Sequence, residues 1–217
     1  MPAALLATLA QLQLPQAAGA WLLLRHAERG ELPPAQPGDH VPLTAEGHAQ
    51  ALALGKALAA RLGTVRCSAV LRCRQTAAAI LTGAEQPGEP HLDPLLGAPG
   101  PFVTDGDRAW PLFVEHGAQG LARLQLRSAS LPGLRAVPQG CGLLLQSLLG
   151  RPPQAGRFDV HVTHDLIIAL LVAHLLGDSD PTAHWPDFLE GVVLWQEGPQ
   201  LHGWFRARRL HVSAAAE

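Results

Sequence analysis

The sequence predicts an α/β fold of three layers, in which helices cover both faces of a mainly parallel central sheet. Apolar strand-like runs alternate with helical patterns along the chain, and this alternation is typical of parallel sheets. Three of the predicted strand-to-helix junctions also carry a basic residue. Open α/β sheets bind their ligands at the carboxyl ends of the strands. We therefore expect the functional residues to lie at that edge of the sheet.

The first predicted strand is the apolar run 21–24, which stops on Arg25 and His26. Arginine offers a planar fork of donors that matches phosphate, and a neutral histidine offers a ring nitrogen that can attack phosphorus. The pair therefore indicates phosphoryl chemistry. Taken alone, it could equally be two solvated polar residues at a strand end.

A helix is predicted over 44–62, a strand near Val65, and an alanine-rich helix over 72–81 that is entered through a polar turn at Ser68. Arg72 lies in the first turn of this last helix, where the helix dipole disfavours a cation. A negative group should therefore compensate for it there.

The third junction follows a predicted strand over 158–163, where the stretch 166–176 indicates a buried helix that stops at Gly177. His164 lies between the strand and the helix N-terminus, where free backbone N–H groups favour an anion. Asp165 could instead be a helix cap and His164 an ordinary loop histidine. Basic residues at three such junctions carry more weight than any one of them.

Towards the end of the chain, 191–201 indicates a pair of strands around a turn, and 206–209 a solvated terminus.

Taken together, these segments resemble the histidine phosphatase superfamily, the phosphoglycerate mutase-like group. The matching pieces are Leu24-Arg25-His26-Ala27-Glu28, with alanine where the family has glycine, the segments 43–51 and 68–77, and His164. The resemblance implies that His26 is the nucleophile and that Arg25, Arg72 and His164 hold the phosphate oxygens. The spacing Arg-His-x-x-Arg, similar to that of the acid phosphatase branch, adds Arg29 to the phosphate-binding set. No metal and no cofactor is then required.

Two residues are candidates for the proton donor to the leaving oxygen. Asp165 follows His164 directly and is similar to the His-Asp pair of the acid phosphatase branch. Asp93 falls where the mutase branch has a glutamate four residues before a glycine, and it is also a candidate for substrate binding. A plain turn residue before Pro94 is the alternative for Asp93. We favour Asp165, because the sequence fixes its place beside a phosphate-binding histidine.

The resemblance implies a metal-independent phosphatase that hydrolyses a phosphomonoester or a phosphohistidine through a phosphohistidine intermediate on His26. Its substrate would be a small phosphorylated metabolite or a phosphoprotein. One alternative is a non-catalytic phospholigand-binding or regulatory protein that kept the pocket. Another is a phosphomutase, which needs a second phosphate-holding surface that the sequence does not reveal. A full basic set together with an acid favours catalysis.

The composition is that of one globular domain over 1–217, with 47% hydrophobic and 16% charged residues. Within it we expect a short N-terminal helix over about 1–18 and a lid-like insertion over about 97–140. A signal peptide is the alternative for the first 20 residues, but no Lys or Arg precedes Arg25.

A formal net charge of −2 gives no reason to expect nucleic acid or membrane partners. The longest apolar run outside the N-terminal segment, 166–176, is too short to span a bilayer. Three cysteines without metal-type spacing fit a reducing cytoplasm better than a disulfide framework.

Overall fold

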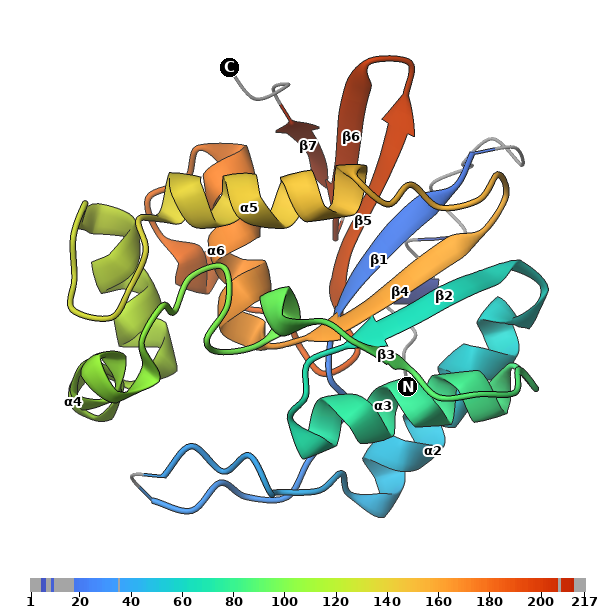
Figure 1. The fold of residues 1–217 in the computed structure, drawn as a ribbon, viewed down its shortest axis with the longest axis horizontal. Coiled ribbons are helices and arrows are strands. Elements are labelled where there is room, and N and C mark those ends of the chain that lie inside the picture. The colour runs from blue at the N-terminus through green and yellow to red at the C-terminus, as the bar shows by residue number, and fades with distance from the viewer. Residues whose placement is uncertain (1–4, 7–8, 10–17, 35, 207, 213–217) are drawn as a thin grey trace.

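The computed structural model describes residues 5–6, 9, 18–34, 36–206 and 208–212, and within them the strands form one seven-stranded sheet (Figure 1). The strands are β1 (Ala20–Arg25), β2 (Leu62–Cys67), β3 (His91–Leu92), β4 (Phe158–Thr163), β5 (Gly191–Glu197), β6 (Gln200–Phe205) and β7 (Arg208–Val212). Their spatial order is β3-β2-β4-β1-β5-β6-β7. The first four are parallel to one another, whereas β5, β6 and β7 each run antiparallel to the preceding neighbour.

Helices cover both faces of this sheet, so the predicted three-layer α/β architecture is confirmed. The helices are α2 (Ala45–Leu58), α3 (Leu71–Gly83), α4 (Gly106–Arg127), α5 (Val137–Leu149) and α6 (Asp165–Leu176). Short 3-10 turns are η1 (Ala59–Arg61), η2 (Pro94–Leu96) and η3 (Pro181–His184). Helices α2 and α3 pack on one face, and α5 and α6 on the other (Figure 1).

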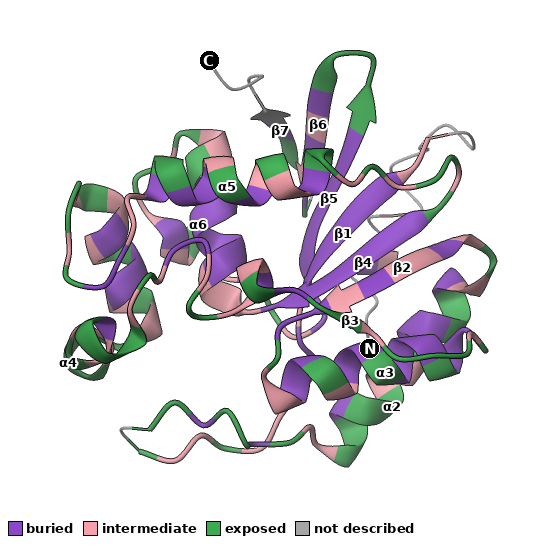
Figure 2. Cartoon of the chain, in the orientation of Figure 1, coloured by how far each residue is buried: buried purple, intermediate pink, exposed green. Residues whose placement is uncertain are grey.

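The central strands are buried on both faces, as Figure 2 shows by their colour. In β1, Leu22 and Leu24 belong to the core under α2 and α3, whereas Trp21 and Leu23 belong to the core under α5 and α6. Successive strand residues point to opposite faces, so an uninterrupted apolar run suits a strand covered on both sides. Burying each such leucine contributes about 1.5–3 kcal/mol. This burial fixes where β1 ends and therefore where His26 lies.

The helix boundaries follow local signals in the sequence. Thr44 caps α2 by accepting a hydrogen bond from the N–H of Gly47 on its side-chain oxygen, at 2.9 Å. The predicted helix 44–62 comprises α2 and η1, and the last residue of that range, Leu62, already begins β2. Helix α6 stops as predicted at Gly177, whose φ of 65° lies in the left-handed region.

The four parallel strands form the core of the described sheet, as predicted, and β5, β6 and β7 extend it with antiparallel neighbours. Within the segment 206–209, expected to be a solvated terminus, Arg208 and Arg209 are exposed, but they begin β7, which pairs with β6 along its length.

The segment 97–140, expected to be a lid-like insertion, holds α4 and the first turn of α5. Helix α4 is kinked at Gly117 and packs through Ala109 and Leu121 against Leu134. Of the N-terminal helix expected over about 1–18, residues 5–6 and 9 are helical, and most of the rest lies outside the described residues. In the described part of the chain, no helix combines the length and the apolar content that crossing a membrane requires.

Candidate active site

His26 lies directly after β1 and is almost completely buried, with an exposed fraction of 2%. Its Nδ1 is 2.8 Å from the carbonyl oxygen of Ala27, so Nδ1 carries the proton and donates to that oxygen. The other ring nitrogen, Nε2, is left with its lone pair. Burial, reinforced by nearby His164 and Arg72, lowers the pKa of His26 to about 2. His26 is therefore a neutral imidazole whose Nε2 carries no proton.

Arg72 enters the site from the first turn of α3 and makes three contacts with its guanidinium. Its Nε donates to Nε2 of His26 at 3.1 Å, its Nη1 donates to the carbonyl oxygen of Gly38 at 2.9 Å, and its Nη2 lies 3.4 Å from Nδ1 of His164. Within the described residues no carboxylate forms an ion pair with Arg72. The negative group expected opposite this arginine is therefore not supplied by a described side chain, and a bound anion would fill that role.

His164 completes the centre of the site from the junction between β4 and α6. Its ring lies edge-on to that of His26, with centroids 5.7 Å apart. Because Nδ1 faces a donor on Arg72, Nε2 carries the proton and donates to Oγ of Ser68 at 3.1 Å. Burial first, and then the charge of Arg72, lowers the pKa of His164. His164 is thus a neutral hydrogen-bond donor beside His26.

Arg25, the last residue of β1, is oriented from three sides. Its Nη2 lies 2.9 Å from Oδ2 of Asp165, its Nη1 donates to the carbonyl oxygen of Pro186 at 2.8 Å, and its guanidinium stands 4.2 Å from the ring centre of Phe188. Its Nε is buried and has no hydrogen-bond partner among the described residues. A buried donor without a partner is costly, so this N–H is available for an anionic ligand.

Thr76 ties the residue after His26 to the helix that carries Arg72. Its Oγ1 accepts from the N–H of Ala27 at 3.0 Å and donates to the carbonyl oxygen of Arg72 at 2.7 Å. Thr76 lies within the motif 68–77, but this role is not predicted from the sequence. The available signal was the spacing of four residues, which places Arg72 and Thr76 on the same face of a helix.

Glu28 holds the loop after His26 against the start of α2. Its carboxylate accepts from Oγ1 of Thr44 at 2.8 Å, and its carbonyl oxygen accepts from the N–H of Thr44 at 3.0 Å. The same carbonyl lies so close to Gly47 that a Cβ there would be 2.1 Å away. Glycine in the motif 43–51 is therefore required by the close approach of this loop.

The structure separates the two proton-donor candidates. Asp165 joins the cluster through its ion pair with Arg25, and its Oδ1 also accepts from the N–H of Leu166. Asp93 is buried and engaged elsewhere: Oδ1 caps η2 by accepting from the N–H of Leu95, and Oδ2 pairs with Arg151 at 2.8 Å. In the described chain no hydrogen bond joins Asp93 to His26, Arg25, Arg72 or His164.

Arg29 lies at the periphery of this group. Its Nη1 donates to the carbonyl oxygen of Gly30 at 2.8 Å. Burial, followed by the positive charges of Arg72 and Arg25, lowers the pKa of Arg29, which places its guanidinium within electrostatic reach of both.

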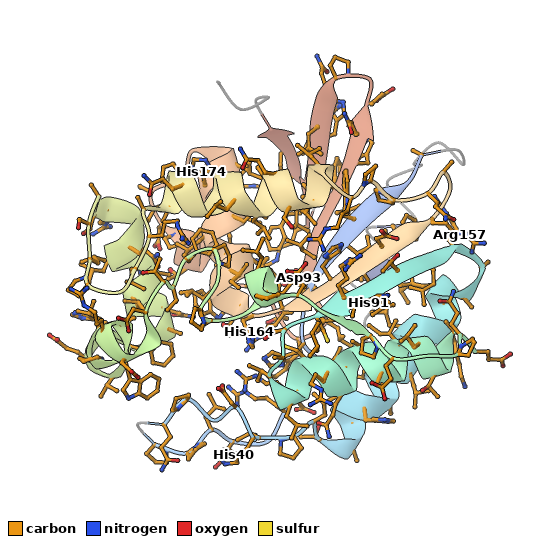
Figure 3. The ribbon with its side chains drawn as sticks, viewed as in Figure 1. His40, His91, Asp93, Arg157, His164 and His174 are labelled. Carbon is orange, nitrogen blue, oxygen red and sulfur yellow. The ribbon has the colours of Figure 1, made fainter. Side chains whose placement is uncertain are left out.

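A cavity of about 660 Å³ borders the site at Ser68. Its lining includes His40 from the loop after β1, Val70 and Leu71 from the start of α3, and Asp93 and Pro99 from the segment after β3. Figure 3 shows His164 between Asp93 above and His40 below in that view. This cavity offers space for a group attached to a phosphate in the site.

No group of three or more His, Cys, Asp or Glu side chains in the described residues is arranged to hold a metal ion.

These motifs match the sequence model of a known protein family. Residues 21–96, which include His26 and Arg72, match the sequence model of the histidine phosphatase superfamily (branch 1). This part of the chain, about a third of its length, is similar to that superfamily. No curated protein matches the chain in sequence.

Solved structures resemble this chain over most of its length. Mycobacterial hydrolase 1 is 19% identical, with a TM-score of 0.62, over 88% of this chain and 99% of that one. A mutant phosphoserine phosphatase from Entamoeba histolytica, in complex with phosphoserine, is 15% identical, with a TM-score of 0.60, over 87% and 97%. A mycobacterial glucosyl-3-phosphoglycerate phosphatase is 19% identical, with a TM-score of 0.55, over 82% and 90%. These similarities show a shared fold.

Proposed function

We propose that this protein is a metal-independent phosphatase that hydrolyses a phosphomonoester or a phosphohistidine through a phosphohistidine intermediate on His26. The observation that carries the proposal is the contact between Nε of Arg72 and Nε2 of His26. A neutral nucleophile and an arginine without a carboxylate partner among the described residues meet there at a buried strand end. Such an arrangement favours a dianionic phosphoryl group held beside the attacking nitrogen.

In the first step, Nε2 of His26 attacks phosphorus in line with the leaving oxygen. The N–P bond forms, the P–O bond to the leaving group breaks, and the leaving oxygen takes up a proton. Arg25 and Arg72 donate hydrogen bonds to the equatorial oxygens, where charge gathers in the transition state, and the N–H of His164 turns from Ser68 to the third oxygen. The N–H at Nδ1 of His26 keeps its hydrogen bond to the carbonyl oxygen of Ala27, which fixes the tautomer that attacks.

Asp165 is the proposed proton-transfer group. Asp165 pairs with Arg25, so a phosphoryl group held by Arg25 lies beside the carboxyl group of Asp165, which enters the reaction carrying a proton. That proton passes to the leaving oxygen. In the second step Asp165 takes a proton from the attacking water, the water oxygen bonds to phosphorus, and the N–P bond breaks to release phosphate and neutral His26.

The fold similarities support the same reaction class. Two of the similar structures carry the names of phosphatases, one acting on glucosyl-3-phosphoglycerate and one solved with phosphoserine. Both names describe small phosphorylated metabolites. We therefore place a small phosphorylated metabolite first among the substrates to be tested and a phosphoprotein second.

The test is phosphate release from p-nitrophenyl phosphate and a panel of phosphorylated metabolites and phosphohistidine peptides, with EDTA present. The variant His26→Ala removes the nucleophile. The matched control is His174→Ala, because His174 is an exposed histidine on α6 that lies away from His164 (Figure 3). Turnover of a radiolabelled substrate followed by rapid denaturation should leave one phosphoryl group on the chain, bound through an acid-labile bond.

Metal-independent turnover that His26→Ala abolishes and His174→Ala retains would support the proposal. Turnover that survives in His26→Ala would overturn the role of the nucleophile. If no substrate is hydrolysed but orthovanadate or phosphate raises the melting temperature, the protein binds phospholigands without catalysis.

A further inference from the structure

The loop 185–190 joins η3 to β5. It is held in place by an ion pair between its last residue, Glu190, and Arg206. Arg206, which follows β6, approaches Glu190 with two nitrogens, Nε at 2.6 Å from Oε1 and Nη2 at 2.8 Å from Oε2. The same Nη2 donates to the carbonyl oxygen of Trp185 at 3.0 Å. Such a bidentate arginine–carboxylate pair fixes both partners in orientation as well as distance.

Glu190 also makes hydrogen bonds within the loop. Its Oε2 also accepts from the N–H of Asp187 at 2.8 Å, and its own N–H donates to the carbonyl oxygen of Asp187 at 3.0 Å. The side chain of Glu190 is mostly buried, with 10% exposed, whereas that of Arg206 is 43% exposed, so the pair lies at the protein surface with its carboxylate turned inward. Both ends of the loop, Trp185 and Glu190, are therefore held by one guanidinium.

The clamped loop contacts the two central residues of the proposed phosphate site. The carbonyl oxygen of Pro186 accepts from Arg25, and the ring of Phe188 covers the Arg25 guanidinium at 4.2 Å. The ring of Phe188 also lies 5.7 Å from that of His26. In the backbone, the N–H of Arg25 donates to the carbonyl oxygen of Glu190 at 2.9 Å.

One residue of the loop has an unfavourable backbone conformation. Leu189 has a φ of 56°, a conformation that residues other than glycine rarely adopt, and it is fully buried. Such a conformation persists only where surrounding contacts fix it. The Glu190–Arg206 pair supplies contacts of that kind on either side of Leu189.

We propose that the Glu190–Arg206 pair is a positioning device for Arg25, which it orients through Pro186 and Phe188 so that the buried Nε points to a bound oxyanion. The device comes from the C-terminal antiparallel strands, outside the residues 21–96 that match the family. Asp165, Pro186 and Phe188 occupy the other sides of the guanidinium, so Nε is the donor they leave free. The proposal rests on the proposed function for the identity of the oxyanion and on the described contacts for the orientation of Arg25.

Two measurements test the positioning role in Glu190→Gln and Arg206→Met, with Arg206→Lys as the conservative variant. The first is the Nε–H resonance of Arg25 in proton–nitrogen spectra, assigned by its loss in Arg25→Lys. The second is the dissociation constant of orthovanadate, measured by calorimetry. The matched control is Arg61→Met. Arg61 likewise donates to a backbone carbonyl oxygen, that of Gly156, and covers an aromatic ring, that of Phe158, but it lies at the amino ends of the parallel strands.

We expect Glu190→Gln and Arg206→Met to shift and broaden the Arg25 resonance and to weaken vanadate binding by up to about 100-fold, the loss that a misplacement of about 1 Å can cause. Arg206→Lys should bind vanadate more tightly than Arg206→Met. Arg61→Met should leave both the Arg25 resonance and the vanadate affinity unchanged, even where it lowers the melting temperature as much as Arg206→Met does. An unchanged Arg25 resonance in folded Glu190→Gln protein would overturn the proposal. Failure of the wild-type chain to bind vanadate would instead count against the proposed function, while the resonance would still decide whether Arg25 is positioned.

Discussion

Arg72 donates the N–H of its Nε to Nε2 of His26 across 3.1 Å, so the lone pair proposed to attack phosphorus is occupied by a hydrogen bond in the free protein. The contact is stable only while His26 is neutral, and burial ensures that by lowering the pKa of His26 to about 2. When a phosphoryl group enters, its oxygens are stronger acceptors than the imidazole, since they carry charge. Arg72 can then turn its donors to the phosphate and release the lone pair.

Replacing Arg72 with lysine should reduce kcat/KM for p-nitrophenyl phosphate by about 100- to 1000-fold, the range for loss of a donor to transition-state charge. A lysine ammonium has no fork that reaches His26, His164 and the carbonyl of Gly38 together. The matched control is Arg74→Lys, since Arg74 is exposed on the same helix. An equal loss in both variants would contradict a specific role for Arg72.

Asp165→Asn should lower kcat/KM by about 100- to 10,000-fold on phosphate esters with poor leaving groups, which is the usual contribution of general acid catalysis. The effect on kcat/KM should be much smaller for p-nitrophenyl phosphate, because p-nitrophenolate leaves without a proton. Asparagine keeps the shape of the side chain but cannot transfer a proton. The measurement is the ratio of kcat/KM for the two kinds of substrate in the variant and the wild type, since kcat/KM reports the transfer to His26 and not the later hydrolysis.

Asp93→Asn provides the comparison for that experiment. Its carboxylate is engaged by Arg151 and by the N–H of Leu95, so we expect the two kinds of substrate to be affected alike. Loss of the ion pair should lower the melting temperature, because it leaves Arg151 without its buried partner. A selective loss on poor leaving groups in Asp93→Asn would reassign proton transfer to Asp93.

Gly47→Ala should lower the free energy of unfolding by about 1–3 kcal/mol or more, because the new Cβ would stand 2.1 Å from the carbonyl oxygen of Glu28. The displaced atom belongs to the backbone two residues after His26, so activity should fall as well. Gly142→Ala is the control, because Gly142 lies within α5 and a Cβ there meets no atom within 4 Å. This second variant should be stabilised by up to about 1 kcal/mol, as measured by urea unfolding.

The local patterns of the sequence were sufficient to predict the central strands and the residues at their ends. Strand β1 and the pairing of Arg25 with His26 follow from an apolar run that stops on basic residues. Strand β7 could not be predicted, because 206–212 contains three arginines, and its place is set by pairing with β6.

Contacts between residues far apart in the sequence could not be predicted from these local patterns. The motif placed Asp93 near the site, but the ion pair with Arg151 draws its carboxylate away, and 58 residues separate the two in sequence. The hold of Arg206 on Glu190 depends likewise on the path of the β5–β6 hairpin. Thr76 lay within a recognised motif, yet its contact with Ala27 required the relative placement of α3 and β1.

Acid sensitivity of the fold should come in part from His161, a histidine of β4 outside the proposed catalytic set. It is 2% exposed, and neither ring nitrogen has a hydrogen-bond partner among the described residues. Burial lowers the pKa of His161 to about 3 against the opposing charge of Asp93, with Arg66 and Arg151 adding to the lowering. The folded chain therefore keeps His161 neutral where the unfolded chain, with an ordinary pKa of 6.5, takes up a proton.

The free energy of unfolding should consequently fall as the pH drops below about 6.5, and His161 alone should account for about 2 kcal/mol between about pH 7.5 and pH 5. His161→Gln removes this titration, so the difference in unfolding free energy between the two pH values should shrink by about that amount. Urea unfolding followed by circular dichroism measures it. His91→Gln is the control, because His91 is an exposed histidine of β3. If His161→Gln kept the full acid sensitivity, the proton uptake would have to come from His26 and His164, whose pKa values are lowered by burial in the same direction.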